Sequence, residues 1–526
     1  MHRAARGCPI MMSNSRESSA PAGPVGQPAT ATSGLRHALL VESAVFLCLL
    51  GSTLVIYSST LVSKYGYLDD YSSFALVNTP RHAFGGAAAL GRPLAGIVGG
   101  LVTRAFHPYD LSVLPCLRFL SIIGITLVAW SIYRSLAWAG WRRVPAVFVG
   151  FAVCTLPSSQ VYAAWASCDT YAYAGFLGAT AGWVAWASLS HFEAGRPARA
   201  WIGAIGAAIL LLAGVTLYQP TAMLFWVVAA IDLLRPSFDL SPATRRRAWG
   251  YALVGMAALA GGWVIFKIGT HAYAWAVQPN RGGISMHPVD KAWWLISEVL
   301  PDVLNLQNIF PSTAIAWAVG AFIVIGLACY LRGPLATRIA GIGLAAILLP
   351  LAYLPNLLAS ESWASYRTQL APGCLVLVLI FMALNGFWKL LNRPAPVILL
   401  AVLVLAAAIS AKRTVKRYIT SPQSIELKFV RTAIATAGEE QSRNVYFIVP
   451  SWLDTPAPGT RYDEFGWPST SAKWVRRSIV PMIRRDLFGR DVDAGTEADV
   501  SPEDAAALSL GRDSMVLDMR KLRGFR

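Results

Sequence analysis

The amino-acid sequence predicts a mainly helical protein that crosses a membrane many times. Of its 526 residues, 55% are hydrophobic and only 14% are charged, and the mean hydropathy is +0.49. A soluble protein carries about 25% charged residues. The 19 Trp and 43 Gly fit this class, because Trp anchors helices at membrane interfaces and Gly lets helices pack closely.

Apolar runs of about 20 residues recur along the chain, and each is long enough to cross a bilayer as a helix. There are about eleven such runs, at residues 38–61, 112–135, 144–160, 170–190, 200–217, 219–234, 249–269, 313–331, 338–357, 371–388 and 395–411. The fifth and sixth runs are separated only by Tyr218, Gln219 and Pro220. They form either two helices joined by a tight turn or one broken helix, and the choice changes the orientation of every later helix.

Composition divides the chain into three predicted regions. Residues 1–34 are rich in Ser, Pro, Ala and Gly and are predicted to be a disordered, cytoplasmic N-terminus. The apolar run that follows is long and has no clear cleavage site, so we predict a retained first helix rather than a signal peptide. Residues 35–411 form the predicted membrane domain. Residues 412–526 are predicted to form a small C-terminal α/β domain, with helices at 422–438 and 473–487 and strands at 444–449 and 513–519.

The Arg and Lys residues in the short connections predict an orientation, because cytoplasmic loops carry an excess of them. With the N-terminus in the cytoplasm, the cytoplasmic connections are 134–143, 191–199, 235–247, 332–338 and 389–393, and each of them contains at least two Arg or Lys. The opposite connections at 161–169 and 218–220 contain none. One group disagrees, since Lys412, Arg413, Lys416 and Arg417 follow the last run on the predicted outer side.

Several function classes are not supported by the sequence. The net charge of +17 would suggest nucleic acid in a soluble protein, but here most Arg residues lie in connections, so no nucleic-acid partner is predicted. None of the seven Cys has CxxC spacing, and no His has ligand-like spacing, which argues against a disulfide framework and a zinc site. The chain has no Walker loop and no GxGxxG after a strand, so no nucleotide site is predicted.

Unusual polar residues gather on the predicted outer side. They are Asp69, Asp70 and Arg92 in the first outer connection, Asp169 in the second, Tyr218 and Gln219 in the third, and Glu361, Tyr366 and Arg367 in the fifth. Two adjacent carboxylates next to apolar sequence are costly unless they have a role. These residues are therefore the candidates for a site assembled from distant segments.

Each candidate also has a structural interpretation. The pair Asp69 and Asp70 is either functional or simply solvated in a loop. Arg92 is either a phosphate or carboxylate partner or an anchor at the membrane interface. Asp169 either contacts a substrate or caps the helix that begins near Thr170.

The later outer connections leave the same choice open. Gln219 either contacts a substrate or belongs only to a turn, with Pro220 at the start of the next helix. Glu361 and Arg367 are either functional or a structural ion pair, although a spacing of six does not place them on one helix face.

The arrangement resembles known membrane glycosyltransferases. A pair of acids in the first outer connection resembles the GT-C class of integral-membrane glycosyltransferases. The wider pattern is similar to the serotype-converting O-antigen glucosyltransferase family in layout over most of the membrane part, through Asp69-Asp70, Gly91-Arg92-Pro93-Leu94, Tyr218-Gln219, Tyr366-Arg367 and, in the tail, Asp463-Glu464-Phe465-Gly466.

This resemblance implies a reaction and a place. A hexose, glucose in this family, would move from a polyprenyl-phosphate donor to an outer-face cell-envelope glycan such as O-antigen. The enzyme would lie in the bacterial inner (cytoplasmic) membrane, with its active site and C-terminal domain extracytoplasmic. The remaining candidates for substrate contacts are Asp169, Tyr218, Gln219, Glu361 and Tyr366.

The chemistry of the residues agrees with this reaction. The acceptor hydroxyl needs a general base, for which a carboxylate is suited, and the departing lipid phosphate needs cations. Asp69 or Asp70 is the expected base, and Arg92 and Arg367 are expected to hold the phosphate by bidentate contacts. One of the two acids could instead hold Mg²⁺ or Mn²⁺, which prefer carboxylate oxygens.

The competing hypothesis is a multi-pass transporter or flippase of a lipid-linked glycan. Such a protein is expected to show internal hydropathy symmetry and ionisable residues near the middle of the membrane. In this sequence the ionisable residues lie at the predicted outer helix ends, and paired halves are not visible.

Overall fold

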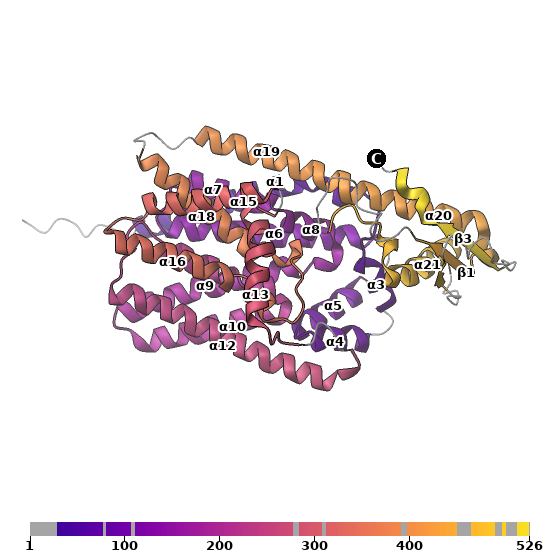
Figure 1. The fold of residues 1–526 in the computed structure, drawn as a ribbon, viewed down its shortest axis with the longest axis horizontal. Coiled ribbons are helices and arrows are strands. Elements are labelled where there is room, and N and C mark those ends of the chain that lie inside the picture. Colours follow the sequence, from indigo (N-terminus) through magenta and orange to yellow (C-terminus); the bar gives the residue numbers. More distant parts are fainter. Residues whose placement is uncertain are drawn as a thin grey trace, which may run out of the picture. The chain divides into compact units, whose positions relative to one another are not determined.

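The computed structural model describes residues 29–76, 80–106, 111–276, 283–307, 312–390, 397–449, 464–489, 497–500 and 513–524 (Figure 1). The chain forms two compact units, Met1–Ala44 and Val45–Arg526. All of the candidate site residues belong to the second unit. Most of the N-terminal segment predicted to be disordered lies outside the described residues.

The first half of the chain consists of helices. They are α1 (Ala29–Ile56), α2 (Ser58–Val62), α3 (Asp69–Leu76), α4 (Pro80–Ala89), α5 (Pro93–Ala105), α6 (Leu114–Trp138), α7 (Arg143–Thr155), α8 (Pro157–Ala164), η1 (Ala166–Cys168), α9 (Tyr171–Glu193), α10 (Pro197–Ala222), α11 (Leu224–Leu233) and α12 (Pro242–Ala272).

The second half adds more helices and three strands. They are η2 (Ala274–Ala276), α13 (Pro288–Trp294), η3 (Leu295–Val299), α14 (Leu300–Leu304), α15 (Thr313–Tyr330), α16 (Leu335–Leu351), α17 (Leu354–Leu358), η4 (Tyr366–Thr368), α18 (Leu370–Leu390), α19 (Val397–Val415), η5 (Lys416–Thr420), α20 (Ser421–Gln441), β1 (Asn444–Ile448), η7 (Ser469–Ser471), α21 (Lys473–Phe488), β2 (Glu497–Asp499), β3 (Ser514–Asp518) and η8 (Met519–Gly524).

Among the described residues, seven helical stretches are long and apolar enough to cross a membrane, and the pair α7 and α8, bent by 56°, makes an eighth if it is one span. The seven are Leu39–Ile56, Leu114–Trp138, Pro197–Ala222, Pro242–Ala272, Thr313–Tyr330, Leu370–Lys389 and Val397–Gln441. The predicted multi-pass helical membrane architecture is therefore confirmed at this level.

The other three predicted spans are also helices, but they do not meet the same criteria. The helices α11 and α16 are apolar but short, with 10 and 17 residues. Helix α9 has 23 residues but is rich in Gly, Ala and aromatic residues rather than in Leu and Val. The count of eleven spans stays a prediction.

Helices α9 and α10 are antiparallel neighbours. Gly203, near the start of α10, lies against Ser188, near the end of α9. Gly214, near the end of α10, lies against Ala174 at the start of α9. The small residues let the two helices approach closely, as is usual where the lipid supplies no hydrophobic driving force between helices.

Helix α11 runs in the opposite direction to α10 and parallel to α9. Gly175 of α9 lies against Leu224. Gly182, about two turns further along α9, lies against Val228. The chain reverses at Tyr218, whose φ of −160° and ψ of 106° interrupt the helical backbone. The fifth and sixth apolar runs are thus two helices joined by a tight turn, and the alternative of one broken helix is wrong.

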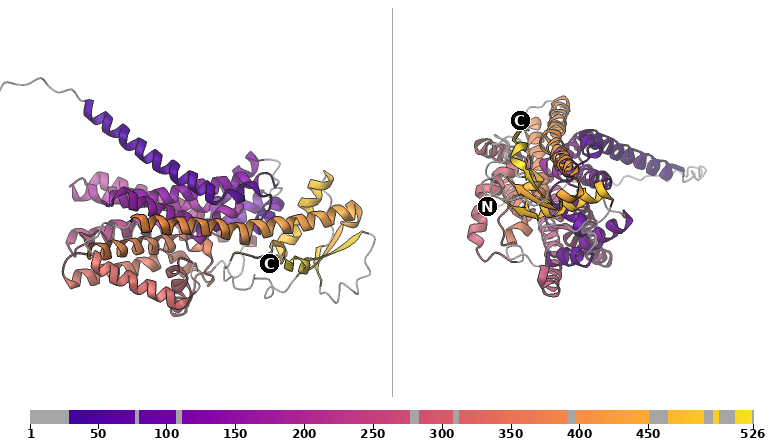
Figure 2. Two further views of the ribbon diagram at one scale, coloured as in Figure 1. Left: turned by 90° about the horizontal axis from the view of Figure 1, so that it is seen from above. Right: turned by 90° about the vertical axis from the view of Figure 1, so that its right-hand side faces the viewer.

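The helices α19 and α20 form one continuous helix through the π-helical segment η5 (Figure 2). The sequence predicted that the helix would end near residue 411, where the composition becomes polar. The helix instead continues past this point, so Lys412, Arg413, Lys416 and Arg417 lie on a helix rather than in a loop. The boundary between the predicted membrane domain and the tail falls inside this helix.

The tail contains a parallel three-stranded sheet with the order β2-β1-β3. Val445 of β1 pairs with Met515 of β3, as the predicted strands at 444–449 and 513–519 require. The apolar face of this sheet and of α21 packs in one cluster with Tyr71 of α3 and Leu114 of α6. A separate C-terminal α/β domain stays a prediction, because this core is shared with the rest of the second unit.

Candidate functional site

Asp70 lies in the first turn of α3 and is fully buried. Its Oδ1 accepts hydrogen bonds from the backbone N–H and the hydroxyl of Ser167, at 2.7 and 2.8 Å. Its Oδ2 accepts from the N–H of Tyr67 at 3.0 Å and from that of Ala166 at 3.4 Å. One carboxylate thus joins the first outer connection to the second.

Arg118 of α6 is the charge partner of Asp70. Its Nη2 lies 3.5 Å from Oδ2 of Asp70 and donates to the carbonyl of Tyr65 at 2.6 Å. The guanidinium also stacks over the Tyr65 ring at 3.6 Å. Burial raises the pKa of Asp70, while Arg118 and the Ser167 hydrogen bonds oppose this shift. With donors on both oxygens, Asp70 has the contacts of a structural ion.

Asp69 has different surroundings. Its side chain is half-buried, and its Oδ1 accepts a hydrogen bond from the indole of Trp474 at 3.0 Å. Trp474 lies on α21 and is 52% exposed. The preceding residue, Leu68, has a φ of 43°, in the left-handed region that a bulky side chain rarely adopts. The backbone strain is held by a hydrogen bond from the Leu68 N–H to the Ser469 hydroxyl at 2.9 Å.

Arg92, Tyr218 and Gln219 come together although about 130 residues separate them in the chain. The Nε of Arg92 donates to Oε1 of Gln219 at 2.7 Å, and the guanidinium lies 4.6 Å above the Tyr218 ring. The Gln219 amide donates to the carbonyl of Leu90 at 3.0 Å. This arrangement needs the turn at Gly91, whose φ is +72°. The predicted turn residues are therefore also the partners of the predicted phosphate contact.

Arg367 lies on η4 and is held by a residue of the tail. Its Nε lies 3.1 Å from Oε1 of Glu464, and its backbone N–H donates to Oε2 at 3.3 Å. The guanidinium faces the rings of Trp165 and Trp363 at 4.9 and 5.7 Å. The alternative of an Arg367 ion pair with Glu361 is wrong, because the acid that Arg367 contacts is Glu464.

Tyr366 is buried beside Arg367. Its carbonyl accepts from the Ser158 hydroxyl at 2.6 Å, and its ring lies 5.9 Å from that of Phe465. It supports the position of Arg367 rather than lining an open surface. Asp463, which precedes Glu464 in the predicted tail motif, lies outside the described residues.

Tyr171 connects the surroundings of the two arginines. Its ring stacks on that of Tyr218, with the centroids 3.6 Å apart and an interplanar angle of 6°. Arg92 faces the Tyr218 ring at 4.6 Å, and Tyr171 also contacts Tyr162, whose hydroxyl donates to the carbonyl of Arg367. We call Asp69, Arg92, Arg367 and the two stacked tyrosines the Asp69 site.

Asp169 is half-buried, just before α9. It accepts a hydrogen bond from the backbone N–H of Thr170, and burial together with the charge of Asp70 raises its pKa to about 7. The N-cap residue of α9 is Thr170, which has no side-chain capping hydrogen bond, so a capping role of Asp169 stays a prediction.

Glu361 is held in a different neighbourhood from the Asp69 site. Its carbonyl accepts from Nζ of Lys291 at 2.7 Å, and the same ammonium donates to the Ser362 hydroxyl at 2.9 Å. Burial lowers the pKa of Lys291, while Glu361 opposes the shift. The described contacts therefore join Glu361 to α13 and do not bring it to Arg92 or Asp69.

Three contributors to the site were not predicted as site residues. Arg118, Ser167 and Glu464 each act on a predicted residue from a distant segment. An arginine near the outer end of an apolar helix was a signal for Arg118, because such a charge requires a partner. Nothing local in the sequence indicates that Ser167 binds Asp70.

The fit of a divalent cation to Asp69 and Asp70 is poor. Within the part of the chain that the structure describes, no three side chains of His, Cys, Asp or Glu come together as a metal site. The oxygens of Asp70 are already occupied by protein donors. The pair therefore does not present two free carboxylates to a metal ion.

No protein-family model matches this sequence, and no curated protein matches it. The function is therefore argued from the residues of the Asp69 site.

Proposed function

We propose that the protein is a membrane glycosyltransferase that moves a hexose, glucose by resemblance, from a polyprenyl-phosphate donor to an outer-face cell-envelope glycan such as O-antigen. The observation that supports this most is the Asp69 site, which combines a half-buried carboxylate and two arginines with the stacked Tyr171 and Tyr218. A carboxylate and two cations are the groups that this transfer requires.

The two arginines are suited to the phosphate of the donor. Each uses its Nε for a protein partner, Gln219 for Arg92 and Glu464 for Arg367. These contacts fix the planes of the guanidinium groups. Among the described contacts, the terminal nitrogens of both remain available for phosphate oxygens, which favour bidentate pairing.

Asp69 is suited to be the base. The Trp474 indole donates to Oδ1, and a half-buried carboxylate at this position is a suitable acceptor for the proton of the acceptor hydroxyl. In the proposed step the acceptor oxygen forms a bond to C1 of the hexose while the bond between C1 and the phosphate oxygen breaks. The acceptor proton moves to Asp69, and the electron pair of the broken bond stays on the phosphate near Arg92 and Arg367.

Helix α5, which begins directly after Arg92, provides an apolar surface for the polyprenyl chain. Its residues Ile97 and Leu101 are 50% and 59% exposed and lie on one helix face. A lipid whose phosphate contacts Arg92 could extend its chain along this face. The proposal places the protein in the bacterial inner membrane, with the N-terminus cytoplasmic and the Asp69 site and tail extracytoplasmic.

The test is transfer by the purified protein in lipid vesicles. With a radiolabelled polyprenyl-phosphate glucose and an O-antigen acceptor, label should appear in the glycan, and nucleotide-activated glucose should not replace the lipid donor. The variant R92Q should raise the KM for the lipid donor by about tenfold, the loss expected for one charge-assisted contact.

The transporter or flippase hypothesis gives a different result. A flippase would move the lipid-linked glycan across sealed vesicles without forming a glycosidic bond, and Asp69→Asn would leave that movement intact. Absence of transfer with every hexose donor, together with such movement, would show that the proposed enzyme function is wrong.

A further inference from the structure

The continuous helix α19–η5–α20 carries four cations that the Asp69 site does not use. Lys412, Arg413, Lys416 and Arg417 are all exposed. None of the four forms an ion pair with another described residue. The guanidinium of Arg417 lies over the ring of Tyr418, 5.4 Å from its centroid. Cations on the predicted outer side are not required by membrane topology, so their position calls for a different physical reason.

The exposed face of α19 changes from apolar to basic within about one turn. Val402, Leu405 and Ile409 are 57%, 61% and 46% exposed, and their spacing places them on one face of the helix. Arg413 and Arg417 continue the same face. A helix that crosses from the hydrocarbon region into the headgroup region has this order of side chains, because Arg stems extend toward the polar layer.

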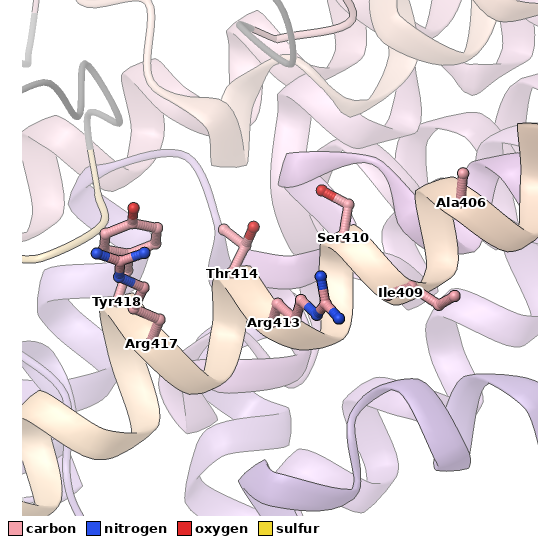
Figure 3. A pocket seen from close by; sticks show the side chains of 7 residues that line it. All are labelled: Ala406, Ile409, Ser410, Arg413, Thr414, Arg417 and Tyr418. Carbon is pink, nitrogen blue, oxygen red and sulfur yellow. The ribbon is translucent and has the colours of Figure 1, made fainter.

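A shallow hollow of about 560 Å³ lies at this transition, lined by the seven residues that Figure 3 labels. Its polar end carries the guanidinium groups of Arg413 and Arg417 and the hydroxyls of Ser410 and Thr414. Its other end is apolar, at Ile409. Two cations and two hydroxyl donors beside an apolar stripe form a site for an anionic group attached to an aliphatic chain.

The hollow lies on the same side of the helices as the Asp69 site. The carbonyl of Tyr418 accepts a hydrogen bond from the N–H of Gly466 at 2.8 Å. Gly466 follows Glu464 by two residues, and Glu464 holds Arg367. Arg413 and Arg417 therefore lie near the same end of the helices as the Asp69 site, which the proposal assigns to one leaflet.

We propose that this hollow binds an anionic phospholipid of that leaflet. The phosphate lies between Arg413 and Arg417, with Ser410 and Thr414 as further donors, and an acyl chain follows the apolar stripe toward Val402. Guanidinium groups suit phosphate by geometry, and clustered cations beside a spanning helix attract anionic lipids. This inference does not depend on the proposed function, since it uses none of the residues of the Asp69 site.

The test is lipid binding to the full chain in detergent, measured by native mass spectrometry with phosphatidylglycerol and phosphatidylcholine as probes. The wild type should retain phosphatidylglycerol more tightly than phosphatidylcholine. The double variant R413Q/R417Q should weaken that binding by about thirtyfold, which corresponds to about 1 kcal/mol per cation near an anionic lipid.

The variant K473Q/R477Q is a matched control, because it removes two exposed cations at the same spacing from α21. It should leave the retention of phosphatidylglycerol unchanged. The proposal is wrong if both variants lose the lipid equally, if R413Q/R417Q keeps it, or if phosphatidylcholine binds as tightly. Displacement by millimolar inorganic phosphate would show a free-anion site, and displacement only by polyprenyl phosphate would show a second donor site, and either result would overturn the phospholipid assignment.

Discussion

Asp69 and Asp70 are adjacent in the sequence, yet the fold gives them opposite surroundings. Asp70 is fully buried, with protein donors on both oxygens and Arg118 as its charge partner. Asp69 is half-buried and accepts an indole hydrogen bond from the exposed Trp474. The first arrangement joins the two predicted outer connections, and the second keeps a carboxylate at a partly exposed position. The two adjacent acids therefore divide into a fully buried ion and the proposed base.

The arginines divide in the same way. Arg118 is enclosed by backbone carbonyls and Tyr65 and has no exposed surface. Among the described contacts, Arg92 and Arg367 are held through Nε, the Arg367 peptide group and the faces of neighbouring aromatic rings. A cation that must bind a substrate needs its plane fixed but its terminal nitrogens available, and only the second arrangement provides both.

The largest expected effect is the loss of transfer in Asp69→Asn. Removing the base should lower kcat by at least about 100-fold, the usual contribution of a general base. The free energy of unfolding should change little, because the amide can still accept from Trp474. Transfer rate and thermal unfolding of the same preparation measure both quantities. A variant that transfers glucose at the wild-type rate would remove Asp69 from the reaction.

Asp70→Asn should mainly affect stability. It leaves Arg118 buried without its counter-charge, which costs about 3–5 kcal/mol. A fall in the unfolding temperature and in the yield of folded protein would measure this. Asp290→Asn is a matched control, because Asp290 is 83% exposed and its loss should not matter. If Asp70→Asn were fully stable but inactive, the assignment of the two acids would be reversed.

A smaller effect is expected when the partner of Arg367 is weakened. Glu464→Gln removes the charge 3.1 Å from Nε of Arg367, so the guanidinium is held less firmly and the KM for the lipid donor should rise by about tenfold, a loss of about 1.4 kcal/mol of binding. The kcat should change less, because the base is untouched. Steady-state kinetics with varied donor measures the two parameters. A lower KM would instead show that Glu464 competes with the phosphate.

The smallest effect concerns the pH dependence of stability. The pKa of Asp169 is raised to about 7 in the folded protein. An aspartate in the unfolded chain has a pKa of about 4. The stabilisation by the protonated form is present below about pH 4 and is lost as the pH rises toward 7. The unfolding temperature should therefore fall across this range.

Asp169→Asn provides the control for this prediction, because its side chain is neutral at every pH. Between pH 4 and 7 the unfolding temperature of the variant should fall less than that of the wild type. The difference between the two falls should be about 2 °C, and it is modest because Asp169 is partly exposed. Parallel pH dependences in the two proteins would show that other groups control the effect.

Much of the fold could be predicted because membrane insertion depends on local composition. The described residues of all eleven predicted runs are mostly helical, and the reversal at Tyr218 was one of two alternatives open from the sequence. The grouping of Arg92 with Tyr218 and Gln219 was also expected from the loop assignment. The continuation of α19 into α20 was not, since a polar composition ends a membrane span but does not by itself end a helix.

By itself, the sequence determined that the chain is mainly helical and where its apolar helices approximately lie, because hydropathy acts over about 20 neighbouring residues. Only the tertiary structure decided which of the two acids is buried and which residue holds Arg367. Those choices depend on Arg118, which is 48 residues from Asp70, and on Glu464, which is 97 residues from Arg367. Contacts over such separations follow from how the helices pack, and no local pattern specifies them.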